Sequence, residues 1–196
     1  MKERAKLRFF RPPVTLTATL YHVKLALSDV ERSVYEALDL RIAMHPSESP
    51  RYLATRLLAY ALSYEDGIAF SKGGISSTEE PAVVIRDPTG VLLAWIEVGA
   101  PTAERLHKAA KAARRVALFT SASIEPLREQ ARAGAIHRAA SIDVWQFEPG
   151  FLDGIAARIE RNVELELVHT DAQLYVTLRG QVLDGRVERS ALLPAS

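Results

Sequence analysis

The segment that most constrains the fold is AVVIRDPTGVLLAWIEV, residues 82–98. Its two apolar runs are short, and the residues between them, DPTG (87–90), suit a type I turn: an Asx residue first, proline second and glycine fourth. Glu97 stands in the second run, and acids are rarely buried without a partner. The segment therefore predicts a β-hairpin that has to accommodate a carboxylate.

Helices and strands alternate around this hairpin. Ser49 and Pro50 are typical of a helix start, because the hydroxyl caps the first turn and the proline needs no hydrogen-bond partner there. Strands that alternate with helices between two terminal hairpins predict an α/β fold, with a mixed β-sheet flanked by helices. We predict helices over 49–64, 102–115, 123–134 and 151–160, strands over 115–121 and 140–147, and hairpins over 14–44 and 163–178.

The chain has 196 residues, of which 48% are hydrophobic and 25% charged, as expected for one domain with a substantial core. We assign this domain to residues 14–193. Residues 1–13, MKERAKLRFFRPP, carry five basic residues and one acid. We expect this arm to be flexible, as chain termini usually are, with contact to nucleic acid or to a partner as the alternative.

Charge and composition narrow the classes of function. A formal net charge of +1 provides no attraction of the whole molecule to nucleic acid or to anionic membranes. The absence of cysteine excludes disulfides and thiolate chemistry. The longest apolar run, GVLLAWIEV, is too short to cross a bilayer, and the N-terminal arm lacks the apolar core of a signal peptide. We expect a cytoplasmic protein with no membrane partner.

Several motifs resemble the YaeQ family of bacterial proteins. These are HPSES (45–49), RLLAYAL (56–62), VALFT (116–120), and the series EEP, RDPTG, WIEVGAP and RLHKA between residues 79 and 109. The resemblance runs from about Val14 to Leu193. It implies a restriction-endonuclease-like core similar to that of the PD-(D/E)XK nucleases, and it implies no established reaction.

In such nucleases, carboxylates hold Mg²⁺ ions that activate water, and a lysine stabilises the developing charge. Under this resemblance Glu97 matches the acid of the (D/E)XK half, and Pro81 matches the proline of the PD half. Ala82 stands where the aspartate is expected, and Gly99 stands where the lysine is expected. If the site is a decayed one, Ala82→Asp should tighten Mg²⁺ binding.

The resemblance suggests replacements for the two missing groups. Glu80 could supply the second acid, Glu48 a third acid, and Lys108 a relocated lysine. We therefore expect Glu48, Glu80, Glu97 and Lys108 to converge on one cleft at the edge of the hairpin. If Asp87 pairs with Gly90, Glu80 lies opposite Glu97. A slip of one residue would place Pro81 there instead.

Structural roles are equally compatible with these residues. Glu97 could form a buried ion pair with Arg56 or Lys108, and Arg56 could clamp a carboxylate. Lys108 could lie on a solvated helix face, where cations near the C-terminus are favourable. His45 could be a hydrogen-bonded anchor of its loop.

Three functional hypotheses follow. The first is a catalytically degenerate module that binds nucleic acid non-specifically, or a protein, and the basic residues Arg105, Lys108, Lys111 and Arg115 would bind the nucleic acid. The second is a divergent Mg²⁺-dependent nuclease that hydrolyses phosphodiester bonds with Glu97 as a metal ligand. The third is an enzyme on the same fold that acts on a small molecule or on another substrate that is not a nucleic acid. An active metal site would need at least two carboxylates about 2.0–2.6 Å from one ion, with Lys108 nearby.

Overall fold

A computed structural model describes residues 18–71 and 80–194. In these ranges ten strands form one mixed sheet, in the order β2-β1-β8-β9-β10-β7-β6-β5-β4-β3. The strands are β1 (Thr19–Asp29), β2 (Val34–Met44), β3 (Ile68–Phe70), β4 (Val83–Arg86), β5 (Leu92–Val98), β6 (Arg115–Thr120), β7 (Ile142–Phe147), β8 (Asn162–Thr170), β9 (Gln173–Leu178) and β10 (Gln181–Ala191). The helices are α1 (Pro50–Leu62), α2 (Ala103–Ala112), α3 (Glu125–Arg132), α4 (Pro149–Ala156) and the 3₁₀ turn η2 (Ala139–Ser141).

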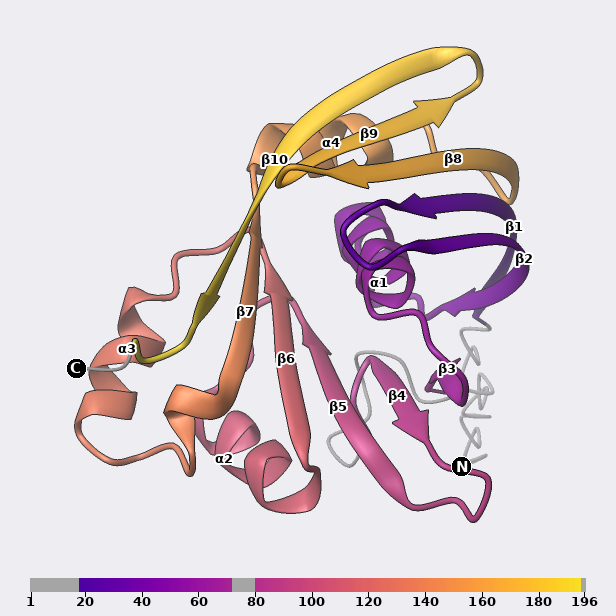
Figure 1. Ribbon diagram of the computed structural model, residues 1–196. Helices are drawn as coiled ribbons and strands as arrows, with labels where there is room; N and C mark the ends of the chain where they lie inside the picture. The colour runs from indigo at the N-terminus through magenta and orange to yellow at the C-terminus, as the bar shows by residue number, and fades with distance from the viewer. Residues whose placement is uncertain (1–17, 72–79, 195–196) are drawn as a thin grey trace, which may run out of the picture.

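The sheet curves around α1, which lies within the curve (Figure 1). Ten consecutive residues of α1, from Leu53 to Leu62, are buried. All of them except Thr55 and Arg56 join the inner faces of the strands and α4 in the main hydrophobic core. A second core lies on the other face of β5, β6 and β7, beneath α2 and α3. The single α/β domain with a large mixed sheet confirms the predicted fold class.

Local sequence explains most of these elements. The β8 segment NVELELVHT alternates exposed and buried side chains along its length, as expected for a strand with one face on the core. The Ser49 hydroxyl accepts a hydrogen bond from the Tyr52 N–H, and Pro50 opens α1. Parallel pairing of β5 with β6 and of β6 with β7 requires crossover connections, which α2 and α3 provide.

The predicted hairpins are present, but two strands were missed and several helix boundaries differ, most clearly in α2 and in α4, which spans Pro149–Ala156 and not 151–160. β1 pairs with β2, and β8 with β9, both antiparallel. Strands β3 and β10 were not predicted. Helix α2 ends at Ala112 and not at Arg115, which is instead the first residue of β6. Residues 14–17 of the predicted N-terminal hairpin, and the arm 1–13, lie outside the described residues.

Candidate functional site

Glu97 is buried near the end of β5, between the sheet and α2. Its side chain is 4% exposed, and Oε1 lies 2.7 Å from Nε of Arg105 in α2. The indole Nε1 of Trp95 donates to the same oxygen at 2.5 Å, and the Val98 backbone N–H donates to the carboxylate as well. This acid is therefore held by an ion pair and by fixed hydrogen bonds.

The alternation of β5 explains why a carboxylate stands here. Ile96 and Val98 face the main core around α1, whereas Trp95 packs in the second core beneath α2. Glu97, two residues after Trp95, lies on that same face of the strand. Thr102 caps α2 by accepting from the Arg105 N–H, which places Arg105 in the first turn of the helix. The first turn of α2 thus delivers a guanidinium to the carboxyl end of β5.

Burial and hydrogen bonding act on Glu97 in opposite directions. Burial raises the pKa of this carboxyl above its usual value of 4.5, because the charged form loses solvation. The hydrogen bond from Trp95 and the positive charge of Arg105 oppose that rise. The guanidinium also lies 5.9 Å from the centroid of the Trp95 ring, so the three side chains form one compact cluster.

A second buried ion pair lies where β2 leads into α1. Nη1 of Arg56 donates to Oε1 of Glu48 at 2.9 Å, and its Nη2 donates to the Ala43 carbonyl at 2.5 Å. The side chains of Arg56 and Glu48 are 1% and 0% exposed. The His45 N–H donates to Oε2 of Glu48 at 3.3 Å, and the His45 carbonyl accepts from the Glu48 N–H at 2.8 Å. The imidazole of His45 lies 2.6 Å from Ser47 Oγ, within the same loop.

Tyr52, in the first turn of α1, links the two ion pairs electrostatically. Burial raises the pKa of its phenol to about 12, and Glu48 and Glu97 both raise it while Arg56 and Arg105 both lower it. Gly99 lies against the tyrosine ring, since a Cβ at that position would be 3.6 Å from the ring carbons. The two ion pairs and Tyr52 make up the candidate site.

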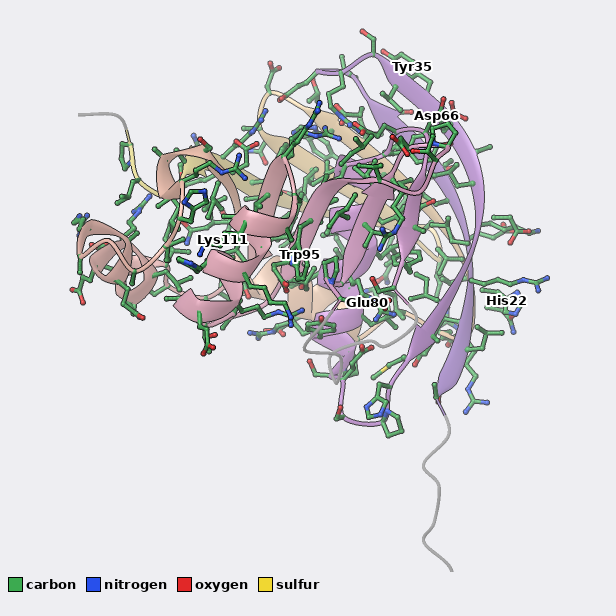
Figure 2. The ribbon with its side chains drawn as sticks, turned by 90° about the horizontal axis from the view of Figure 1, so that it is seen from below. His22, Tyr35, Asp66, Glu80, Trp95 and Lys111 are labelled. Carbon is green, nitrogen blue, oxygen red and sulfur yellow. The ribbon has the colours of Figure 1, made fainter. Side chains whose placement is uncertain are left out.

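Glu80 reaches this site through its backbone. Nη2 of Arg105 donates to the Glu80 carbonyl at 2.7 Å, while the residue itself is exposed. Figure 2 shows Trp95 between Glu80 and the helix that carries Lys111. Lys108 is exposed, one turn along α2 from Arg105.

Both registers predicted for the central hairpin are wrong. Val83 pairs with Ile96, and the register shifts at a bulge between Ile85 and Arg86. If this register continues by one residue, Ala82 lies opposite Glu97, in place of Glu80 or Pro81. The turn itself was predicted correctly, since the Gly90 N–H bonds the Asp87 carbonyl at 2.9 Å. Beside the turn the Asp87 N–H bonds the Val91 carbonyl, so the ladder begins one residue later than the first register assumed. The extra residue in the bulge, which the turn sequence does not reveal, moves the pairing by one more.

The arrangement does not offer a magnesium ion a set of carboxylates. Among residues 18–71 and 80–194, no three histidine, aspartate or glutamate side chains are grouped so that they could hold a metal. Glu48 and Glu97 each bind an arginine instead. Ala82 is 2% exposed and belongs to the main apolar core. These residues therefore do not fit a Mg²⁺ centre.

The four basic residues predicted to bind nucleic acid differ in their contacts. Arg105 binds Glu97, and Arg115 forms a two-pronged ion pair with Glu65. Lys108 and Lys111 are exposed on α2. Both arginines therefore pair with carboxylates, while Arg115, Lys108 and Lys111 are exposed at the surface.

Two residues of the site were missed at the level of sequence. Trp95 precedes Glu97 by two positions and so shares its face of the strand, which is a signal that the spacing alone provides. Tyr52 follows the helix cap Ser49 by three positions, but nothing local indicates that its ring lies between two ion pairs.

The YaeQ protein family model matches residues 14–186. The chain belongs to the YaeQ family. The uncharacterised YaeQ protein of Escherichia coli K12 is 28% identical to it over 166 residues, which cover 84% of this chain and 91% of the relative. The uncharacterised YaeQ protein of Salmonella typhi shows the same identity and coverage.

Two crystal structures of YaeQ proteins share this fold. The structure from Pseudomonas syringae aligns with a TM-score of 0.79 and 28% identity, and covers 88% of this chain and 95% of that one. The structure from Xanthomonas axonopodis pv. citri aligns with a TM-score of 0.80 and 27% identity, and covers 89% and 99%. In the described part of this YaeQ-family chain, no helix is long and apolar enough to cross a membrane.

Proposed function

We propose that this YaeQ-family protein is a catalytically degenerate module that binds nucleic acid without sequence specificity. The observation that carries the proposal is the row of exposed cations on and just after α2: Lys108, Lys111 and Arg114. They accompany a single acid on that helix, Glu104. Side chains of this kind bind phosphates by releasing counterions, and they do not read bases.

Loss of catalysis is supported by how the site is filled. The carboxylate of Glu97, the acid that the nuclease resemblance requires, binds Arg105 and Trp95. Gly99, at the position where that resemblance expects lysine, has φ +87°, a conformation that L side chains rarely adopt. Both features favour a binding role over phosphodiester hydrolysis.

The magnitude of the effect follows from the number of cations. About three phosphate contacts predict a slope of roughly −2.7 in log K against log salt. Raising salt from about 50 to 200 mM should then weaken binding about 40-fold. With so few contacts, binding should be weak, with Kd on the order of 10⁻⁴–10⁻⁶ M at physiological salt.

Fluorescence anisotropy with short single- and double-stranded DNA and RNA at two salt concentrations tests the proposal. The test variant replaces Lys108, Lys111 and Arg114 with alanine. The control replaces Arg41, Arg161 and Arg186, which are also exposed but lie on other elements, so that both variants lose three charges. We expect the first variant to lose binding and the second to keep most of it. Equal losses, or no binding at low salt, would refute the proposal and favour a protein partner.

The nuclease alternative has a separate test. If Glu97 exchanges Arg105 for Mg²⁺, then Mg²⁺ or Mn²⁺ should bind the wild type and not Glu97→Gln. The wild type should also cleave single- or double-stranded substrates. Cleavage that disappears in Glu97→Gln would replace the binding proposal with the nuclease.

A further inference from the structure

A small cavity lies beside the last residue of α1 and the first residues of β6 and β7, away from Glu97. Its volume is about 150 Å³. Arg115 is the first residue of β6 and Asp143 the second residue of β7, while Glu97 lies near the last residue of β5. In Figure 2, Asp66, which follows α1, lies apart from Trp95 and Glu80. The cavity is therefore distinct from the candidate site above.

The inner part of the cavity is apolar and its rim is charged. The apolar lining includes Ile85, Ala94, Ile96 and Trp145, all of which are buried members of the main core. The rim is formed by Arg32, Glu65, Arg115, Asp143 and Arg189. A ligand that fits both parts must have an apolar body and a polar end.

The rim has more hydrogen-bond donors than acceptors. Both oxygens of Glu65 accept from Arg115, and Oδ2 of Asp143 lies 3.3 Å from Nη2 of Arg189. Contacts among the described residues engage two nitrogens of Arg115 and one of Arg189, and a guanidinium offers further N–H groups. This surplus of N–H groups favours a ligand that accepts hydrogen bonds, and a charged acceptor forms the stronger bonds to a guanidinium.

Two of the three arginines are suited to meet a ligand. Arg115 and Arg189 have side chains that are 56% and 59% exposed. Arg189 also lies 5.0 Å from the centroid of the Trp145 ring, which holds its guanidinium over the aromatic wall. Arg32 is engaged by the protein itself, because it binds Asp29 at 2.6 Å and donates to the Ala61 and Tyr64 carbonyls at the end of α1.

The volume limits the size of the ligand. About 150 Å³ corresponds to roughly five water molecules at about 30 Å³ each. A molecule of about six or seven non-hydrogen atoms fills such a space, whereas a nucleotide does not fit. Drug-sized ligands occupy pockets of about 300–1,000 Å³.

We propose that this cavity binds a short-chain aliphatic monocarboxylate of about four or five carbons. The alkyl chain packs in the apolar part against Trp145, and the carboxylate accepts hydrogen bonds from Arg115 and Arg189. The proposal is independent of nucleic-acid binding, since it uses no residue of α2.

An NMR titration of the ¹⁵N-labelled full chain tests this site. Butyrate and valerate are the probes, and the uncharged butanol and the cationic butylamine are controls with an alkyl chain of similar length. We expect the carboxylates to shift the Trp145 indole resonance and the amide resonances of Ala94 and Arg115, with saturation. Octanoate should bind more weakly than valerate because it exceeds the cavity. Shifts of the same size with butylamine, or tighter binding of octanoate, would overturn the proposal.

A matched pair of variants locates the contact. Arg189→Gln should weaken valerate binding at least about tenfold, because it removes a charge-assisted hydrogen bond. Arg179→Gln is the control, since Arg179 is 61% exposed and likewise paired with a carboxylate, Glu160, at 2.8 Å. An unchanged dispersion of the amide spectrum shows that each variant is folded. Equal affinities in Arg189→Gln and the wild type would refute the assignment.

Discussion

The buried pair of Glu48 and Arg56 allows a quantitative test of how this fold tolerates charge. Arg56→Met keeps the approximate shape of the side chain and removes its charge. Glu48 would then remain as a buried carboxylate without its guanidinium, although it would still accept from the His45 N–H at 3.3 Å. Breaking one partner of a buried pair costs about 3–5 kcal/mol. The Ala43 carbonyl also loses its 2.5 Å bond, which adds about 1 kcal/mol.

We therefore expect Arg56→Met to lower the free energy of unfolding by about 4–6 kcal/mol. For a domain of this size that corresponds to a fall in Tm of roughly 10–20 °C. Glu48→Gln should cost about 3–5 kcal/mol, because it leaves the guanidinium buried without an anion. The double variant should cost less than the sum, by about 2–3 kcal/mol, since neither charge is then left alone.

Urea denaturation followed by circular dichroism measures all three variants, with the midpoint and the slope fitted separately. The exposed pair of Arg179 and Glu160 provides the control cycle, because its side chains are 61% and 55% exposed. Its coupling energy should be below about 1 kcal/mol. Additive losses at Arg56 and Glu48 would refute the reasoning, because they would mean that the two charges do not depend on one another.

Three further predictions concern the candidate site. Burial raises the pKa of Glu97 above 4.5, so between the pKa of the unfolded chain and that of the folded state only the folded state holds the proton. The free energy of unfolding should therefore fall as pH rises through this interval. Urea titrations across the interval should show that slope in the wild type and not in Glu97→Gln. Gly99→Ala should destabilise the protein by about 1–2 kcal/mol in the same assay, because its φ is +87° while its Cβ would make only ordinary contact with Tyr52. Tyr52 has a pKa of about 12 in the folded state against 10.0 normally, so the stability it contributes should be lost as pH rises through that interval. Burial raises the pKa of Tyr60 as well, so phenolate absorbance should show late-titrating groups, of which Tyr52→Phe removes one.

Local sequence signals predicted most of the fold. Alternation identified β8 and β9, and the Ser49-Pro50 pair located the start of α1. Strand β10 was missed because its Asp184-Gly185 step resembles a turn. It is a continuous strand because Gly185 lies beneath Phe151 of α4, where a Cβ would come within 2.3 Å of the ring. That contact joins segments far apart in the chain, and no local pattern reveals it.

The sequence predicted the buried acid of the candidate site, Glu97, but not the cation that pairs with it. The run LLAWIEV indicated that Glu97 needs a counter-charge, but Arg56 and Lys108 were named for it. The partner is Arg105, one turn before Lys108 on α2. The rotation of α2 decides between them, and that rotation is set by the packing of Leu106 and Ala110 against the second core. Such packing depends on the assembled sheet, so helical periodicity alone does not fix which cation meets the acid.

Ala82→Asp distinguishes a decayed metal site from a position that belongs to the core. Under the nuclease resemblance this change restores a missing acid and should tighten Mg²⁺ binding. The structure predicts otherwise, because Ala82 is 2% exposed among the apolar side chains of the main core. A carboxylate there should cost several kcal/mol of stability, since burial disfavours its charged form. Ala82→Asn is the matched control for size. Urea titrations of both variants with and without Mg²⁺ decide the matter, because a ligand that binds only the folded state raises its stability. Recovery with Mg²⁺ in the aspartate variant alone would contradict the core assignment and show that a metal site persists beside Glu97.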